Sequence, residues 1–162
     1  MVQAVDKVSL SLDRGESMGL VGESGCGKSS VAMAIMRLMP PNAMIIGGEI
    51  LFKGENILLK EDEEIRKIRW KEISMVFQAA MNALNPVISV GDQIIEAIQV
   101  HNEMSESEAW KQVEELYQLV GLDPGRGKSY PHEYSGGMKQ RAIIAMSLAC
   151  SPDLIIADEP TT

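Results

Sequence analysis

The segment that decides the expected fold is Gly22-Glu23-Ser24-Gly25-Cys26-Gly27-Lys28-Ser29. Its spacing is G-x-x-x-x-G-K-[ST]. Residues 17–21 before it predict a buried strand, and the periodicity of residues 29–38 predicts a helix. Glycines let the backbone curl until successive N–H groups point inward, and a helix start adds the positive end of its dipole. The pattern predicts a phosphate-binding loop; the alternative is a glycine-rich turn that holds no ligand.

The residues of this loop have expected roles toward a nucleotide. Lys28 would reach the β- and γ-phosphates, and the hydroxyl of Ser29 would bind Mg²⁺. Cys26 is interpreted as a small residue that the loop tolerates. The expected ligand is ATP with Mg²⁺, and the predicted nucleotide-binding residues are Gly22, Glu23, Ser24, Gly25, Cys26, Gly27, Lys28, Ser29 and Ser30.

An acidic pair lies near the end of the chain. The four apolar residues Leu154–Ala157 predict a buried strand, and Asp158 and Glu159 follow it directly. In phosphate-binding folds, an aspartate at the end of such a strand holds Mg²⁺ directly or through water. We therefore predict that Asp158 contributes to a magnesium site. Taken alone, the pair is equally compatible with two solvated acids at a strand end.

A third segment, Ser135-Gly136-Gly137, is predicted to open a helix. A serine hydroxyl and two glycine N–H groups at a helix start form an anion site. The wider stretch Tyr134-Ser135-Gly136-Gly137-Met138-Lys139-Gln140-Arg141 is similar to the signature of ABC ATPases, usually Leu-Ser-Gly-Gly-Gln. Tyr134 and Met138 differ from that pattern at its first and last positions. With the phosphate loop and the acidic pair in this order, the chain resembles the nucleotide-binding domain of an ABC transporter ATPase.

The resemblance implies a reaction and a partner. The signature residues would bind the γ-phosphate held by a second nucleotide-binding domain, in a head-to-tail homodimer or heterodimer; these residues are Ser135, Gly136, Gly137 and Met138. Glu159 would polarise the attacking water. Gln78 resembles the glutamine that senses the γ-phosphate and Mg²⁺, although a glutamine after a strand is also commonplace. The implied catalytic residues are Glu159 and Gln78, and the implied magnesium ligands are Ser29, Gln78 and Asp158.

A finer resemblance is to the ATP-binding subunits of dipeptide, oligopeptide and nickel importers. It is carried by residues 83–87 (ALNPV), 131–138 (PHEYSGGM) and 157–162 (ADEPTT). It implies an ATP-hydrolysing subunit that powers an importer, bound to transmembrane permease subunits and peripheral on the cytoplasmic face of the cell membrane. The alternatives are an ABC-type ATPase of DNA repair or translation, and a non-catalytic nucleotide-binding fragment.

Composition limits the class of partner. The chain has 162 residues, 45% of them hydrophobic, and a net charge of −8. We therefore expect no nucleic-acid partner, because nucleic-acid binding needs a basic surface that releases counterions. No apolar stretch approaches the roughly 20 residues of a membrane-spanning helix. The two cysteines are too few for a disulfide framework.

The order of the expected elements gives an α/β class. Strands are predicted at 8–12, 17–21, 49–53, 73–77 and 154–157, and helices at 29–38, 61–71, 90–100, 105–120 and 136–149. The resemblance implies a P-loop NTPase (RecA-like) core with a mainly parallel sheet, a small N-terminal antiparallel β part and a helical insertion. We expect residues 1–84 and 135–162 to form the core and residues 85–134 the helical subdomain.

Family domains normally begin with a further strand and continue past the acidic pair to a histidine switch. Neither feature is found in residues 1–162. We therefore expect a partial nucleotide-binding domain, truncated at both ends, with marginal stability and little turnover by itself.

Overall fold

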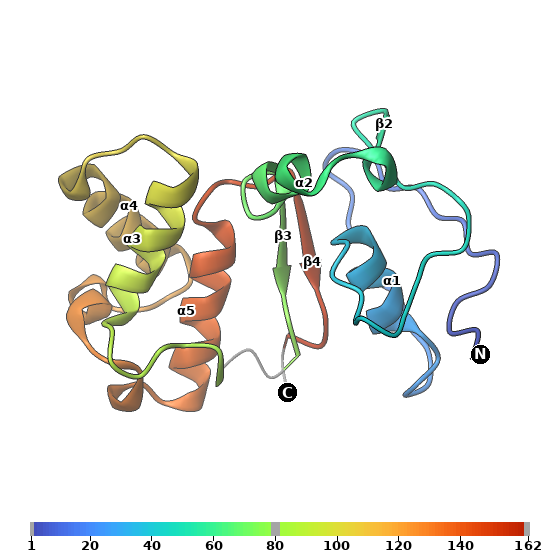
Figure 1. The fold of residues 1–162 in the computed structure, drawn as a ribbon. Coiled ribbons are helices and arrows are strands. Elements are labelled where there is room, and N and C mark those ends of the chain that lie inside the picture. The colour runs from blue at the N-terminus through green and yellow to red at the C-terminus, as the bar shows by residue number, and fades with distance from the viewer. Residues whose placement is uncertain (1, 79–81, 161–162) are drawn as a thin grey trace. The chain divides into compact units, whose positions relative to one another are not determined.

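The computed structural model describes residues 2–78 and 82–160 of the chain. The chain forms two compact units, Met1–Arg66 and Lys67–Thr162 (Figure 1). In chain order, with η for 3-10 helices, the elements are α1 (Lys28–Ile35), β1 (Leu51–Phe52), β2 (Glu55–Asn56), η1 (Ile57–Leu59), α2 (Asp62–Ile68), β3 (Ile73–Val76), α3 (Val90–His101), α4 (Glu106–Leu119), η3 (Pro124–Lys128), η4 (Pro131–Glu133), α5 (Gly136–Leu148) and β4 (Leu154–Ala157). These elements confirm the predicted α/β class. The boundaries proposed for a core and a helical subdomain stay a prediction.

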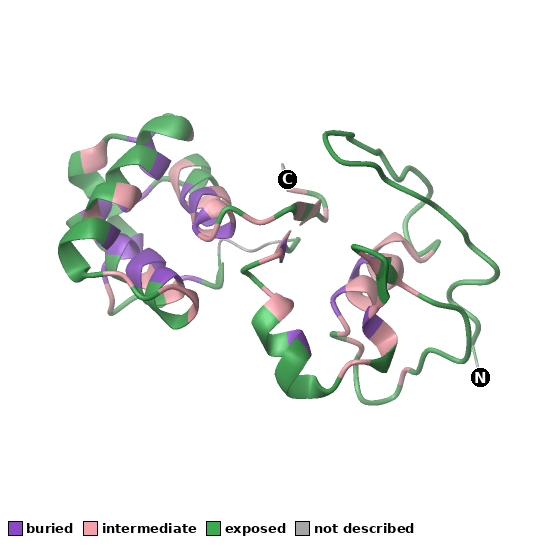
Figure 2. Cartoon of the chain, turned by 90° about the horizontal axis from the view of Figure 1, so that it is seen from above, coloured by how far each residue is buried: buried purple, intermediate pink, exposed green. Residues whose placement is uncertain are grey.

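The first unit contains a helix, a short hairpin and a thin core. β1 and β2 pair antiparallel, and the two residues that connect them, Lys53 and Gly54, both have positive φ, at 51° and 83°. Positive φ at both central positions is the geometry of the tight turn that suits a two-residue hairpin. The buried residues among 2–66 are only Ala32, Met36, Ile57 and Ile65, so most of this unit is exposed (Figure 2).

Arg37 ties the end of α1 to the segment that follows the hairpin. Its Nη1 donates to the carbonyl oxygens of Ile57, at 3.3 Å, and of Lys60. Its Nη2 forms an ion pair of 3.1 Å with Asp62 at the start of α2. The fork of guanidinium donors thus holds three positions of one segment, which matters in a unit with so few buried side chains.

Two predicted strands in this unit are wrong. Residues 8–12 and 17–21 have no strand structure, and Val8, Leu10, Leu20 and Val21 are all exposed. The predicted strand at 49–53 is shortened to the two residues of β1. An apolar pattern supplies a face for burial, but a strand also needs a neighbouring backbone to take its N–H and C=O groups. Among the described residues, neither segment has such a ladder.

The second unit is built on a parallel strand pair and three helices. β3 and β4 lie side by side in parallel, with Ile73 opposite Leu154 and Val76 opposite Ala157 (Figure 1). The buried core lies among α3, α4 and α5 (Figure 2), and its fully buried members include Val90, Ile94, Ile98, Ala109, Val113, Tyr117, Ala142, Ala145 and Ala149.

The β4 strand forms where expected but is not buried. Its residues alternate between intermediate and exposed, and Ile155 is 43% exposed. The described part of the sheet has two strands, so β4 lies at an edge of it. Residues 123–134, for which no helix or strand is predicted, contain the two short helices η3 and η4. None of the described helices is long and apolar enough to cross a bilayer.

Serine side chains begin the three long helices of this unit. Ser89, Ser105 and Ser135 are the N-caps of α3, α4 and α5, and each accepts a hydrogen bond from a backbone N–H in the first turn. Ser105 and Glu108 form a capping box, because the Glu108 carboxylate also accepts the N–H of Ser105. The Ser105 hydroxyl donates to the Glu108 carboxylate and lowers the pKa of that group. α4 ends before Gly121, whose φ of 70° suits a glycine.

Removal of this cap gives the first testable prediction. Ser105→Ala should lower the free energy of unfolding by about 1 kcal/mol, because the first turn of α4 loses the oxygen that accepts the Glu108 N–H. Ser107→Ala is the matched control, since Ser107 is an exposed residue inside the same helix and should change stability by less than about 0.5 kcal/mol. Urea unfolding of the two variants measures the difference. Equal effects would show that the cap contributes nothing.

Candidate functional site: a phosphate loop and a carboxyl-terminal strand edge

The predicted phosphate loop has a backbone that only glycine allows at two positions. Gly25 and Gly27 have φ values of 81° and 99°, in the left-handed region. A Cβ at Gly27 would lie 2.5 Å from the backbone oxygen of Ala4, and one at Gly22 would lie 2.7 Å from Cys26 Sγ. The loop is therefore closely packed against its own chain, and α1 begins directly after its last glycine, Gly27.

Lys28 folds back across this loop. Its Nζ donates to the carbonyl oxygens of Gly22 and Glu23, both at 2.8 Å, and lies 3.8 Å from Cys26 Sγ. The ammonium thus stands within the curl of the loop, at the residue where α1 starts. Because phosphate oxygens carry charge, they are stronger acceptors for an ammonium than these carbonyls are.

The loop fits a polyphosphate in its donor chemistry. The first turn of a helix presents N–H groups for which the helix has no carbonyl acceptor, and its dipole favours an anion there. Ser29 and Ser30 add hydroxyls in the first turn of α1. The predicted nucleotide-binding residues all lie in the unit Met1–Arg66.

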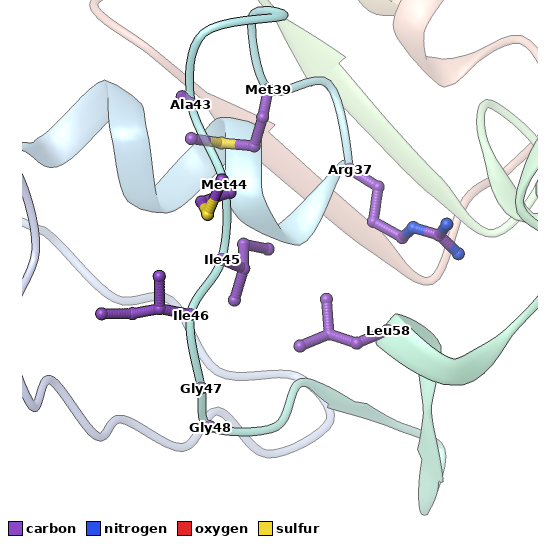
Figure 3. Close-up of a pocket in the computed structure, with 9 residues that line it drawn as sticks. All are labelled: Arg37, Met39, Ala43, Met44, Ile45, Ile46, Gly47, Gly48 and Leu58. Atoms are coloured by element: carbon purple, nitrogen blue, oxygen red, sulfur yellow. The ribbon is translucent and has the colours of Figure 1, made fainter.

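A hollow of about 400 Å³ also lies in this unit, but it is not the predicted site. It is lined by Arg37, Met39, Ala43, Met44, Ile45, Ile46, Gly47, Gly48 and Leu58. Figure 3 shows Ile45 and Leu58 pointing toward one another across it. Apart from Arg37 and two glycines, its lining residues have apolar side chains, and none belongs to the phosphate loop, so we assign no nucleotide to it.

The parallel strands bring the two predicted catalytic residues together. The ladder continues past the strands, because the N–H of Asp158 donates to the carbonyl of Val76 at 2.9 Å. With the same register, Gln78 lies opposite Glu159, and its Nε2 donates to Glu159 Oε2 at 2.8 Å. Glu159 has a φ of 47°, an unusual conformation for a non-glycine residue and one that clusters at functional sites.

The residues that follow the carboxyl ends of β3 and β4 fit Mg²⁺ only as part of a larger set of ligands. The described residues contain no cluster of three or more His, Cys, Asp or Glu side chains that could hold a metal ion. Mg²⁺ in nucleotide sites is typically held by one or two protein groups, with phosphate oxygens and water completing its octahedron. Asp158 and Gln78 carry oxygen ligands of that kind, so this pair suits a metal that arrives with its nucleotide.

The signature segment presents an exposed helix start. Ser135 Oγ accepts the N–H of Met138 at 3.3 Å, and α5 begins at Gly136. Ser135, Gly136 and Gly137 are exposed, and a Cβ at Gly137 would have no atom within 4 Å. The predicted second anion site therefore faces open space, whereas Tyr134 beside it is buried.

Two polar contacts near the site are not apparent from the sequence motifs. Gln140 Nε2 donates to the carbonyl of Pro160, directly after Glu159, and so links α5 to the acidic pair. The hydroxyls of Tyr117 and Tyr134 meet at 2.9 Å beneath the signature segment. A glutamine on the first turns of α5 is a weak signal by itself. The tyrosine pair gives no local signal, because its members lie 17 residues apart.

Thr161 and Thr162, the end of the importer-like stretch, lie outside the described residues.

The fold and these segments define a class of protein. The family model described as "ABC transporter" matches residues 5–162, nearly the whole chain. The chain belongs to the ABC transporter family. The resemblance drawn from the phosphate loop, signature and acidic pair is thereby confirmed, and with it the P-loop NTPase fold.

Its relatives narrow the class. The chain is 53% identical, over 99% of its length, to the dipeptide transport ATP-binding protein DppD of Bacillus subtilis. It is 48% identical to the oligopeptide transport ATP-binding protein OppD of the same organism and 47% identical to OppD of Escherichia coli, again over 99% of its length. The chain spans about half the length of these relatives, at 46% to 49%.

Solved structures show the same fold. The chain resembles the dimeric bacterial ABC transporter cassette MJ0796 with a TM-score of 0.84 and 31% sequence identity, over 98% of this chain and 66% of that one. A second structure of that cassette, a dimer in a post-hydrolysis state bound to ADP and Pi, gives the same TM-score and coverage.

Proposed function

We propose that this chain is a nucleotide-binding domain that binds and hydrolyses Mg-ATP to power an ABC importer, with di- and oligopeptides as the favoured cargo and nickel as the other candidate. The observation that carries the proposal is the Lys28 ammonium, held by two carbonyls inside a glycine loop at the start of α1. The named relatives are dipeptide and oligopeptide transport proteins, which favours this class over DNA repair or translation.

The residues divide the reaction between binding and hydrolysis. Lys28 would exchange its loop carbonyls for β- and γ-phosphate oxygens, which stabilises negative charge there. When bound, Mg²⁺ supplies further charge neutralisation, and Ser29, Gln78 and Asp158 are the residues that would hold it. Glu159 would accept a proton from the attacking water. Gln78, which is hydrogen-bonded to Glu159, would orient the Glu159 carboxylate.

The partners follow from the same assignment. The exposed signature segment would close on the nucleotide of a second nucleotide-binding domain, head to tail. Residues 85–134 would form the helical subdomain that contacts the permease subunits, with residues 1–84 and 135–162 as the core. The protein would then be peripheral, on the cytoplasmic face of the membrane.

Nucleotide-dependent stability tests the proposal. Mg-ATP at 100 times its dissociation constant should raise the free energy of unfolding by about 2.7 kcal/mol. AMP at the same concentration should give a much smaller shift, because it lacks the phosphates that Lys28 is proposed to hold. Urea unfolding with each nucleotide measures both. No shift with Mg-ATP, or equal shifts with ATP and AMP, would contradict a polyphosphate site at this loop.

A further inference from the structure

We propose that Tyr134 is a positioning residue, which fixes the signature segment (Ser135–Met138) through a buried chain of hydrogen bonds to α4 and η3. Tyr134 directly precedes Ser135, the N-cap of α5, and its hydroxyl is hydrogen-bonded to Tyr117 in α4 and to Arg126 in η3. The inference rests on the proposed function, in which the signature segment must meet the nucleotide of a partner in a defined orientation.

The number of protons on the hydroxyl groups decides which group donates in each of these two hydrogen bonds. Tyr134 Oη lies 2.6 Å from the carbonyl oxygen of Arg126 and 2.9 Å from Tyr117 Oη. A carbonyl can only accept, and a phenol has one proton to donate. Tyr134 therefore donates to Arg126, and Tyr117 donates to Tyr134. The Tyr134 oxygen takes part in both bonds, whereas the Tyr117 oxygen takes part in one of them.

Because both tyrosines are buried, these hydrogen bonds strongly restrict the position of the Tyr134 ring. Tyr117 is 0% exposed and Tyr134 is 5% exposed, and both belong to the core formed with α3, α4 and α5. Burial raises the pKa of both phenols, so both remain protonated at physiological pH. A buried polar group without a partner is costly, so the bonds favour one placement of the Tyr134 ring.

The position of Tyr134 affects the signature segment directly, because the two are adjacent in the backbone. Tyr134 ends η4, where its N–H donates to the carbonyl of Pro131 at 3.2 Å, and it precedes Ser135, the N-cap of α5. The next three residues, 135–137, are exposed. The buried and hydrogen-bonded Tyr134 is therefore adjacent in sequence to the exposed N-terminus of α5, which the proposed function assigns to the partner's nucleotide. The leucine usual at this position of the signature could fill the core, but it could not form these bonds.

Three phenylalanine variants separate positioning from packing. Tyr134→Phe keeps the ring and removes both bonds, whereas Tyr117→Phe leaves the bond from Tyr134 to Arg126. Tyr130→Phe is the matched control, since Tyr130 lies four residues before Tyr134 and is 43% exposed. The double variant Tyr117→Phe/Tyr134→Phe removes the hydroxyl that Tyr134→Phe leaves buried without its acceptor. It should therefore be more stable than Tyr134→Phe, without restoring the link to Arg126.

The first measurement is hydrogen exchange of the backbone amides of Met138 and Lys139, which donate to Ser135, in the nucleotide-free chain. Tyr134→Phe and the double variant should exchange at least about tenfold faster there than wild type, because the opening free energy of the first turn falls. Tyr117→Phe should change less, and Tyr130→Phe should match wild type. Unchanged exchange in Tyr134→Phe would overturn the proposal whatever the chain does with nucleotide.

The second measurement is nucleotide-driven dimerisation, followed by sedimentation with Mg-ATP in a Glu159→Gln background. Tyr134→Phe should weaken dimerisation about tenfold, because the segment that meets the partner is displaced, while the affinity of the monomer for Mg-ATP changes less than about twofold. The double variant should remain as weak as Tyr134→Phe despite its higher stability. Recovery of dimerisation with stability, or dimerisation unaffected by Tyr134→Phe, would overturn the positioning role.

The two proposals fail in different ways. If the Glu159→Gln chain does not dimerise with Mg-ATP at all, the proposed function loses its dimer, and the exchange measurement alone decides whether Tyr134 holds the signature segment. If dimerisation occurs and exchange is unchanged in Tyr134→Phe, the function stands and the positioning role falls.

Discussion

Replacement of Lys28 by alanine should abolish the stabilisation that Mg-ATP gives to this chain. The Lys28 ammonium is the group that stands inside the glycine loop, within 2.8 Å of two carbonyl oxygens. Each charge-assisted hydrogen bond to a phosphate is worth about 1.5–3 kcal/mol, so loss of two such bonds should weaken binding by at least roughly 100-fold. Calorimetric titration with Mg-ATP, together with urea unfolding, measures the loss.

A second lysine distinguishes this effect from the loss of one positive charge. Lys111 is exposed on α4. Lys111→Ala should therefore leave the Mg-ATP shift unchanged while it alters the net charge by the same amount. Without nucleotide, Lys28→Ala should lower stability only slightly, since its loop contacts are exposed. Equal Mg-ATP affinity in Lys28→Ala and wild type would refute the role assigned to the loop.

Glu159→Gln should lower ATP turnover by about 10²–10⁴-fold and leave nucleotide binding in place, because general base catalysis contributes a factor of that size. The substitution preserves the shape of the side chain. An oxygen remains to accept the 2.8 Å hydrogen bond from Gln78, so the geometry of the strand edge is kept while the basic carboxylate is lost. Phosphate release under saturating Mg-ATP measures turnover, and the urea experiment measures binding.

Glu114→Gln is the control for this prediction. Glu114 is exposed on α4, away from the β3–β4 edge, and its change should affect neither turnover nor binding. If Glu159→Gln retained wild-type turnover, Glu159 would not be the base. If it lost binding as well as turnover, its carboxylate would be serving the structure of the edge rather than the chemical step.

The helices were predictable because their determinants are local. The predicted helix at 90–100 is α3, Val90–His101, and the predicted helix at 105–120 is α4, Glu106–Leu119. A cap, an apolar face at helical spacing and a glycine stop all lie within one element, so a single stretch of sequence contains the information.

The strands were less predictable because their partners are distant in sequence. Residues 8–12 alternate as a strand should, yet they form none, whereas residues 154–157 form β4 beside β3. Alternation cannot name the neighbouring strand or its register. For the same reason, the contact of Gln78 with Glu159 could not be read from two motifs 81 residues apart, although each motif was recognisable by itself.

Because few side chains are buried around the phosphate loop, the affinity for nucleotide should depend on the stability of the fold of residues 2–66. The described part of that unit buries only Ala32, Met36, Ile57 and Ile65. Nucleotide can bind only the fraction of molecules whose loop is already shaped, so the observed affinity is the intrinsic affinity multiplied by that fraction. A substitution that enlarges the core around Ala32 would therefore tighten nucleotide binding without touching a phosphate.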